Sequence, residues 1–172
     1  MRQALAAGNV TILDGRVTTT LVNNNSSVTG IGGAPNSTDK STVRILGGVI
    51  NAVGGGYGSG IGGGHGDTQV AEVEIGGGAQ VTAKGGLGDN EYNRGPGAAI
   101  GTNGDVGGKA GKELDVNASG EGTVTRVDPN LPADHEHKWI LVSSTPAAVG
   151  QLGEKEYKCS SCGSTRTVYK YV

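Results

Sequence analysis

The sequence predicts an all-β fold, a parallel β-solenoid of three to four irregular turns followed by a small β-rich tail. A pattern of strand, Gly-Gly, strand and glycine-rich tract recurs at intervals of about 30 to 39 residues, a period typical of solenoids. The composition agrees, because 34 of the 172 residues are glycine, none is phenylalanine and only 3% are aromatic. Such a chain lacks the large rings of a conventional core, whereas a solenoid buries a few aliphatic side chains per turn.

The best-formed repeat covers residues 42–64 and reads TVRILGGVINAVGGGYGSGIGGG. Its two short strands are separated by Gly47-Gly48, and the glycines that follow suit tight corners because glycine tolerates positive φ. Alternation of period two selects the inward-facing candidates. They are Val43, Ile45, Val49 or Ile50, Val53 and Ile61.

Two sets of aliphatic residues mark equivalent places in successive repeats. Val10, Val43 and Val73 form the first set, and Ile31, Ile61 and Ile100 form the second. We expect an ordered chain, because its glycines punctuate short Val/Ile strands and the net charge of −2 is too small to hold it open by self-repulsion.

The pattern weakens toward the C-terminus. The third repeat is interrupted by an insertion over residues 89–96, and a final partial turn includes Val124. We predict a glycine-rich solenoid over 1–128, a linker over 129–134 whose prolines oppose strand pairing, and a small β, zinc-ribbon-like CxxC module over 135–172.

Charge and hydropathy exclude two classes of partner. The 16 acidic and 14 basic residues are interspersed and create no field suited to nucleic acid. No apolar run approaches the ~20 residues that a membrane span needs. The N-terminal residues lack the apolar centre of a signal peptide, and a start almost inside a repeat leads us to expect a mature fragment.

The tail contains four residues of the types that bind zinc. They are His135, His137, Cys159 and Cys162, the last followed by Gly163, which lets backbone amides turn toward the thiolates. We predict a zinc site, with a disulfide or free thiols in a small β unit as the alternatives. A redox role is disfavoured because no βαβ pattern surrounds the pair. The expected core of the tail is Trp139, Ile140, Val142, Tyr157, Val168 and Tyr169.

A calcium site is a second metal hypothesis. Asp67 and Asp89 each follow Gly-Gly-x-Gly, and at one corner of successive turns they could share calcium through oxygen ligands. The spacing is one residue shorter than that of RTX-type calcium repeats. We therefore favour the alternative of two solvated turn aspartates.

Glycan binding is the hypothesis for the insertion, because sugar sites combine exposed aromatic rings with polar groups. The candidate ligand-binding residues are Tyr57, Asp89, Asn90, Tyr92 and Arg94. An enzyme is not expected, since three or four turns are short for the groove of a polysaccharide lyase and the sequence shows no serine or cysteine nucleophile pattern. Polysaccharide lyase activity is the least favoured function.

Both parts of the chain resemble known sequences. The tract GGGYGSGIGGG with its flanking strands resembles the glycine-rich β-solenoid repeats of large surface proteins of gut and other Gram-positive bacteria. The tail, with HEHKW, TPAAVG and YKCSSCGSTRT, resembles the short His/Trp–CxxCG modules strung along those proteins. The resemblance implies right-handed winding, export to the cell surface and no catalytic residues.

We therefore expect a non-catalytic structural or adhesive module that is secreted or displayed at the cell surface. Solenoid ends expose unpaired strand edges, and the sequence shows no cap at either end. We expect copies to assemble through these ends into an oligomer or fibre. A carbohydrate-binding module is the alternative function.

Overall fold

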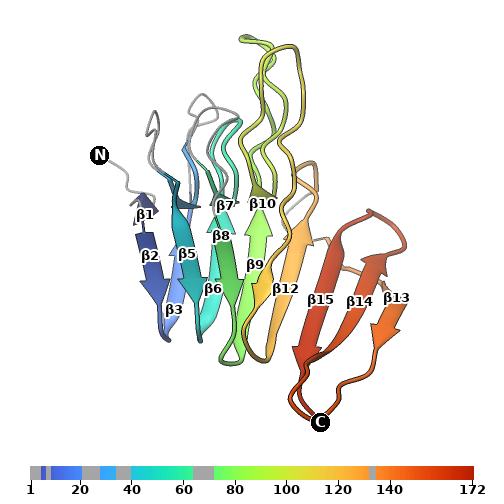
Figure 1. Ribbon diagram of the computed structural model, residues 1–172. Coiled ribbons are helices and arrows are strands. Elements are labelled where there is room, and N and C mark those ends of the chain that lie inside the picture. The colour runs from blue at the N-terminus through green and yellow to red at the C-terminus, as the bar shows by residue number, and fades with distance from the viewer. Residues whose placement is uncertain (1–4, 7–8, 21–27, 34–39, 64–71, 132–134) are drawn as a thin grey trace.

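The computed structural model describes residues 5–6, 9–20, 28–33, 40–63, 72–131 and 135–172. Within these ranges the chain forms fifteen strands and no helix, arranged in three sheets (Figure 1). The predicted all-β class with parallel pairing is confirmed. In the described part of the chain, no helix has the length and apolar character to cross a membrane.

The strands succeed one another in sets of three, one strand for each sheet. The first sheet contains β1 (Leu5–Ala6), β4 (Ile31–Gly32), β7 (Ile61–Gly62) and β10 (Ile100–Gly101). The second contains β2 (Asn9–Ile12), β5 (Thr42–Ile45), β8 (Glu72–Ile75) and β11 (Asn117–Ala118). The third contains β3 (Arg16–Thr19), β6 (Val49–Val53), β9 (Ala79–Lys84) and β12 (Gly122–Val127), then three strands of the tail. We call β1–β12 the repeat stack.

Strands of the repeat stack pair in parallel, each with the strand one repeat away. Val10 is in register with Val43, which is in register with Val73. Ile31, Ile61 and Ile100 form a second such row. Both predicted sets of equivalent residues are therefore confirmed.

The core is made of rows of small and branched aliphatic side chains, including fully buried Ile45, Ile50 and Ile61. Of the two alternatives in β6, Ile50 is the buried one, together with Ala52, while Val49 is 38% exposed and Val53, also expected inside, is only partly buried. The cause is the turn before β6, where Gly48 adopts φ +84° and the inward and outward alternation restarts with Val49 facing out.

Three strands of the first sheet, β4, β7 and β10, each consist of an Ile-Gly pair. Gly32, Gly62 and Gly101 have φ of +129°, +139° and +153°, in the region that favours glycine. A Cβ atom on Gly62 would lie 2.1 Å from the carbonyl oxygen of Gly101. Glycine at these positions therefore lets β4, β7 and β10 approach so closely.

The tail extends the third sheet beyond the other two, as Figure 1 shows at its red end. β12 pairs in parallel with β9, and its other edge pairs antiparallel with β15 (Thr165–Lys170). Then follow β14 (Gly153–Cys159) and β13 (Trp139–Thr145), the edge strand. The predicted boundaries at 128 and 134 stay predictions, and part of the linker, 132–134, lies outside the described residues.

The C-terminal end of the repeat stack is covered at two of its three sheets, contrary to our expectation of an uncapped end. At the third sheet β15 covers β12. At the first, Gly101 forms an antiparallel bridge with Glu113, and Leu114 N–H donates to the Ile100 carbonyl at 2.9 Å. The Glu113 carboxylate also accepts hydrogen bonds from the amides of Ala99 and Ile100.

Candidate metal centre

Strand pairing brings the two halves of the predicted zinc site together. The histidines directly precede β13, whereas Cys159 ends β14 and Cys162 lies in the turn before β15. Pairing of Trp139 with Cys159 places the start of β13 beside the end of β14. The turn is closed by a 3.2 Å hydrogen bond from Gly163 N–H to the Cys159 carbonyl, with Gly163 at φ +76°.

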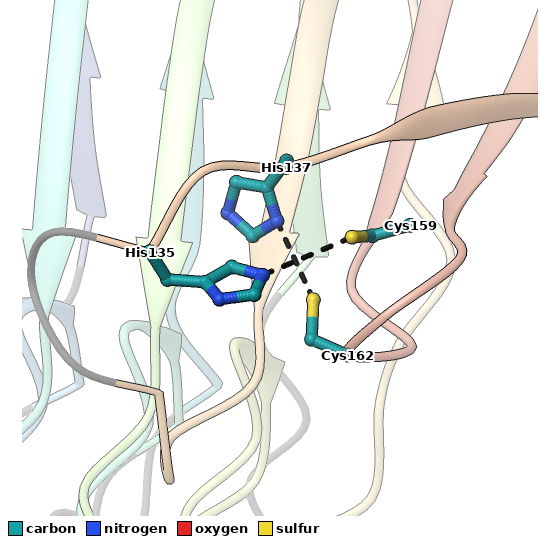
Figure 2. A group of neighbouring side chains, drawn as sticks. All are labelled: His135, His137, Cys159 and Cys162. Atoms are coloured by element: carbon teal, nitrogen blue, oxygen red, sulfur yellow. Dashed lines mark hydrogen bonds between the residues drawn. The ribbon is translucent and has the colours of Figure 1, made fainter.

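The four side chains point toward one another (Figure 2). One ligand atom from each of His135, His137, Cys159 and Cys162 lies within 4.8 Å of all the others, so this His₂Cys₂ cluster could hold a metal ion. Cys159 Sγ is 3.9 Å from His135 Nε2, and Cys162 Sγ is 3.4 Å from His137 Nδ1. Tetrahedral zinc places sulfur and nitrogen ligands about 3.5 Å apart, which the two distances bracket.

The Cys159 thiol is ready to act as a ligand. Burial raises its pKa, but hydrogen bonding to Ser161 and to the imidazoles of His135 and His137 outweighs burial and lowers the pKa to about 4. Ser161 Oγ lies 3.2 Å from its sulfur. Because metals bind the thiolate, ionisation at neutral pH favours metal binding.

Both cysteines are free in the structure, and each faces an imidazole instead of the other thiol. The arrangement differs from the disulfide alternative. It also differs from thiols packed only as small apolar groups, since two imidazoles converge on them.

Trp139 is the residue near the cluster that our sequence interpretation misplaced. It stacks on His137 with ring centroids 4.7 Å apart, and the Arg166 guanidinium lies 4.4 Å from its ring centre. Arg166 Nε in turn donates to Thr125 Oγ1 on β12 at 3.3 Å. The signal was in the sequence, because residues two apart in an extended chain, such as 137 and 139, share a face.

The expected core of the tail is wrong in part. Ile140 and Val142 are 58% and 63% exposed, because β13 is an edge strand and the core cluster of the described residues does not extend to it. Tyr169 instead packs against the core of the repeat stack. The tail therefore buries little apolar surface of its own.

The insertion forms an ordered turn that brings several predicted glycan residues together. Asp89 and Arg94 form an antiparallel bridge, and the Arg94 guanidinium lies 5.2 Å from the Tyr57 ring centre. Tyr57 is therefore partly covered. Tyr92 is 61% exposed, and Asn90 is exposed beside it.

Of the calcium residues, Asp67 lies outside the described residues. Asp89 is 7% exposed, so it is not the solvated aspartate that we favoured. Its Oδ1 accepts hydrogen bonds from the amides of Glu91 and Tyr92, whereas its buried Oδ2 has no hydrogen-bond partner among the described residues. Within the described ranges Asp89 belongs to no group of three or more potential metal ligands.

Comparison of the chain with protein-family models, curated proteins and solved structures finds no match.

Proposed function

We propose that this chain is a non-catalytic structural module of a protein exported to a bacterial cell surface, wound as a right-handed parallel β-solenoid of three to four turns. The observation that carries the proposal is the in-register stacking of like residues, such as Ile31, Ile61 and Ile100. A stack of this kind gains stability from each neighbouring pair of turns and suits a stalk or adhesin. An incubation with pectin that released unsaturated products would contradict a non-catalytic role.

We further propose that the His₂Cys₂ cluster holds one zinc ion with a structural role. Two thiols and two imidazoles give the four protein ligands of a closed structural site. A unit of about forty residues holds only a marginal core, and the exposed aliphatic side chains of β13 agree with this. Zinc would then supply much of the folding free energy of the tail.

The zinc proposal is tested by elemental analysis of the purified chain. We expect one zinc per chain, lost in Cys162→Ser and His137→Ala and kept in Ser160→Ala, the matched control in the same turn. Cobalt exchanged into the site should give the intense visible absorption of a tetrahedral thiolate complex. A metal-free chain that folds fully and binds neither zinc nor cobalt would overturn the proposal.

The C-terminal end of the repeat stack is covered at two of its three sheets, so among the described strands β11 alone keeps an open edge there. Of the described strands, β1, β2 and β3 each end their sheet at the N-terminal side, so three edges lie together there. An interface using the same end of two copies closes on itself as a dimer, whereas a fibre requires two different ends. We propose a head-to-head pair instead of the fibre that the sequence suggested.

Light scattering over a range of concentrations tests this assembly. We expect a reversible monomer–dimer equilibrium, and Thr11→Pro in β2 should shift it toward monomer while Thr82→Ser, within the stack, leaves it unchanged. Long fibres in electron micrographs would contradict the closed pair.

Glycan binding at the insertion is the second candidate, favoured by exposed Tyr92 beside the ordered Asp89–Arg94 bridge. We expect Tyr92→Ala to abolish retention on a polysaccharide gel and Tyr171→Ala, an exposed tyrosine elsewhere, to preserve it. Equal retention of both variants would exclude this site.

A further inference from the structure

The tail and the end of the repeat stack enclose a groove of about 810 Å³ that our sequence analysis did not foresee. One wall is residues 113–118, which contain β11. The other wall is a face of β14 and β15. The groove exists because the third sheet continues into the tail, as Figure 1 shows, while the second sheet ends at β11.

The tail wall continues the inward face of the repeat stack. Val124, fully buried in the core, is paired with Thr167, which is paired with Glu156. Residues directly opposite in a sheet point to the same side, so Glu156 faces the space that aliphatic side chains fill further back. Glu154 follows at the same face, two residues away. The face of the third sheet that is buried and aliphatic in the repeat stack is therefore polar and open in the tail.

The opposite wall offers a strand edge. β11 is the last strand of its sheet and pairs with β8 on one side, and among the described strands none pairs with its other side. Asp115 and Asn117 are exposed there. A terminal strand presents N–H and C=O groups to an added strand.

The groove is negatively charged. It is lined by Glu113, Asp115, Glu154 and Glu156 against Arg126 and Lys158, and Arg126 is already paired with Glu113 at 3.2 Å. The negative charge of the groove contributes to the raised pKa of the Tyr169 phenol. Burial raises its pKa first, and Glu154, Glu156 and Asp115 raise it further against the opposing effect of Arg126.

We propose that this groove binds an extended peptide segment of a partner protein that carries lysine or arginine at alternate positions. The segment adds to β11 as a further strand, and its cationic side chains turn toward Glu154 and Glu156. Alternate residues of a strand are about 6.6 Å apart, so the peptide's cations repeat at the same interval as these two carboxylates. Charge sign excludes nucleic acid and acidic peptides from the groove.

The test uses the full chain and a labelled peptide, Lys-Thr-Lys-Thr-Lys-Thr, followed by fluorescence polarisation. We expect saturable binding that weakens at least tenfold in the double variant Glu154→Gln, Glu156→Gln. The control Glu91→Gln, at an exposed carboxylate outside the groove, should bind as the unaltered chain does. A peptide with glutamate in place of lysine should not bind.

A second arm separates strand addition from attraction of charge alone. The same peptide methylated at the backbone nitrogen of alternate residues keeps its charges but loses the hydrogen-bond donors of one edge, and it should bind at least tenfold more weakly. Spermine should compete poorly. Equal binding of the methylated peptide, efficient competition by spermine, or no saturable binding would each overturn the proposal.

Discussion

Trp139 contacts the candidate metal centre without belonging to its four potential ligands. Its ring stacks on His137 and is in contact with Arg166, which is hydrogen bonded to Thr125 of β12. The imidazole is therefore oriented by a chain of contacts that ends in the repeat stack. Residues behind a ligand commonly change metal affinity by about 10- to 100-fold.

We predict that Trp139→Leu lowers zinc affinity about tenfold, because His137 loses its stacking partner, while Trp139→Phe stays near the original affinity because its ring still stacks. Competition with a chromophoric chelator measures both. If the leucine and phenylalanine variants bind zinc equally, the ring has no orienting role.

The Cys159 thiol predicts how the metal-free chain responds to pH. Its folded pKa of about 4 lies below the ordinary value of 9.0, so the unfolded chain binds more protons between these values. Stability from this group is fully present above the unfolded pKa and is lost as pH falls through the folded pKa. We expect the melting temperature of the chelated chain to rise with pH more steeply than that of Cys159→Ser.

Fluorescence of Trp139, the only tryptophan in the chain, follows this melting from about pH 5 to about pH 8. Ser160→Ala controls for a change in the same turn. Parallel curves for the chain and Cys159→Ser would show that the thiol is not ionised in the folded tail.

Among the elements, β7 depends on both of its residues, each for a different reason. Ile61 is fully buried between its equivalents, and Gly62 has a neighbouring backbone oxygen where a Cβ would lie. We predict that Ile61→Ala costs about 2 to 5 kcal/mol of unfolding free energy, measured by urea denaturation.

Gly62→Ala should cost more than Gly78→Ala. Both glycines have positive φ, but nothing lies within 4 Å of a Cβ built on Gly78. The Gly78 change therefore carries only the conformational penalty of about 1 to 2 kcal/mol, while the Gly62 change adds a clash with backbone. Equal costs would mean that the strands of the first sheet can separate without loss.

Strand positions in the repeat stack were predictable because alternation and glycine punctuation are local signals. Which residues of β6 face inward could not be decided from the sequence, since this depends on the positive φ of Gly48 in the turn before the strand. The histidines and cysteines were predictable as a set from their chemistry. The contact by which Glu113 covers the end of the first sheet could not be predicted. Residues 104–111 carry no periodicity, and the hydrogen bond with Ile100 is set by tertiary structure.

For the whole molecule, the tail determines which edges remain open. We predict that a chain ending at Val127 associates in a concentration-dependent manner more strongly than the full chain, because β12 loses its antiparallel neighbour β15. Light scattering measures this, with circular dichroism to confirm retained β structure. A truncated chain that stays as dispersed as the full one would show that β15 does not protect this edge.

The change from parallel to antiparallel pairing at β12 also limits how such a chain can lengthen by duplication. A duplicated repeat inserted before β12 would have parallel strands on both sides and could form the same Ile-Gly strand of the first sheet. A copy appended after β12 finds that edge already taken by a strand of opposite direction. Growth by gene duplication would therefore occur within the repeat stack, upstream of β12.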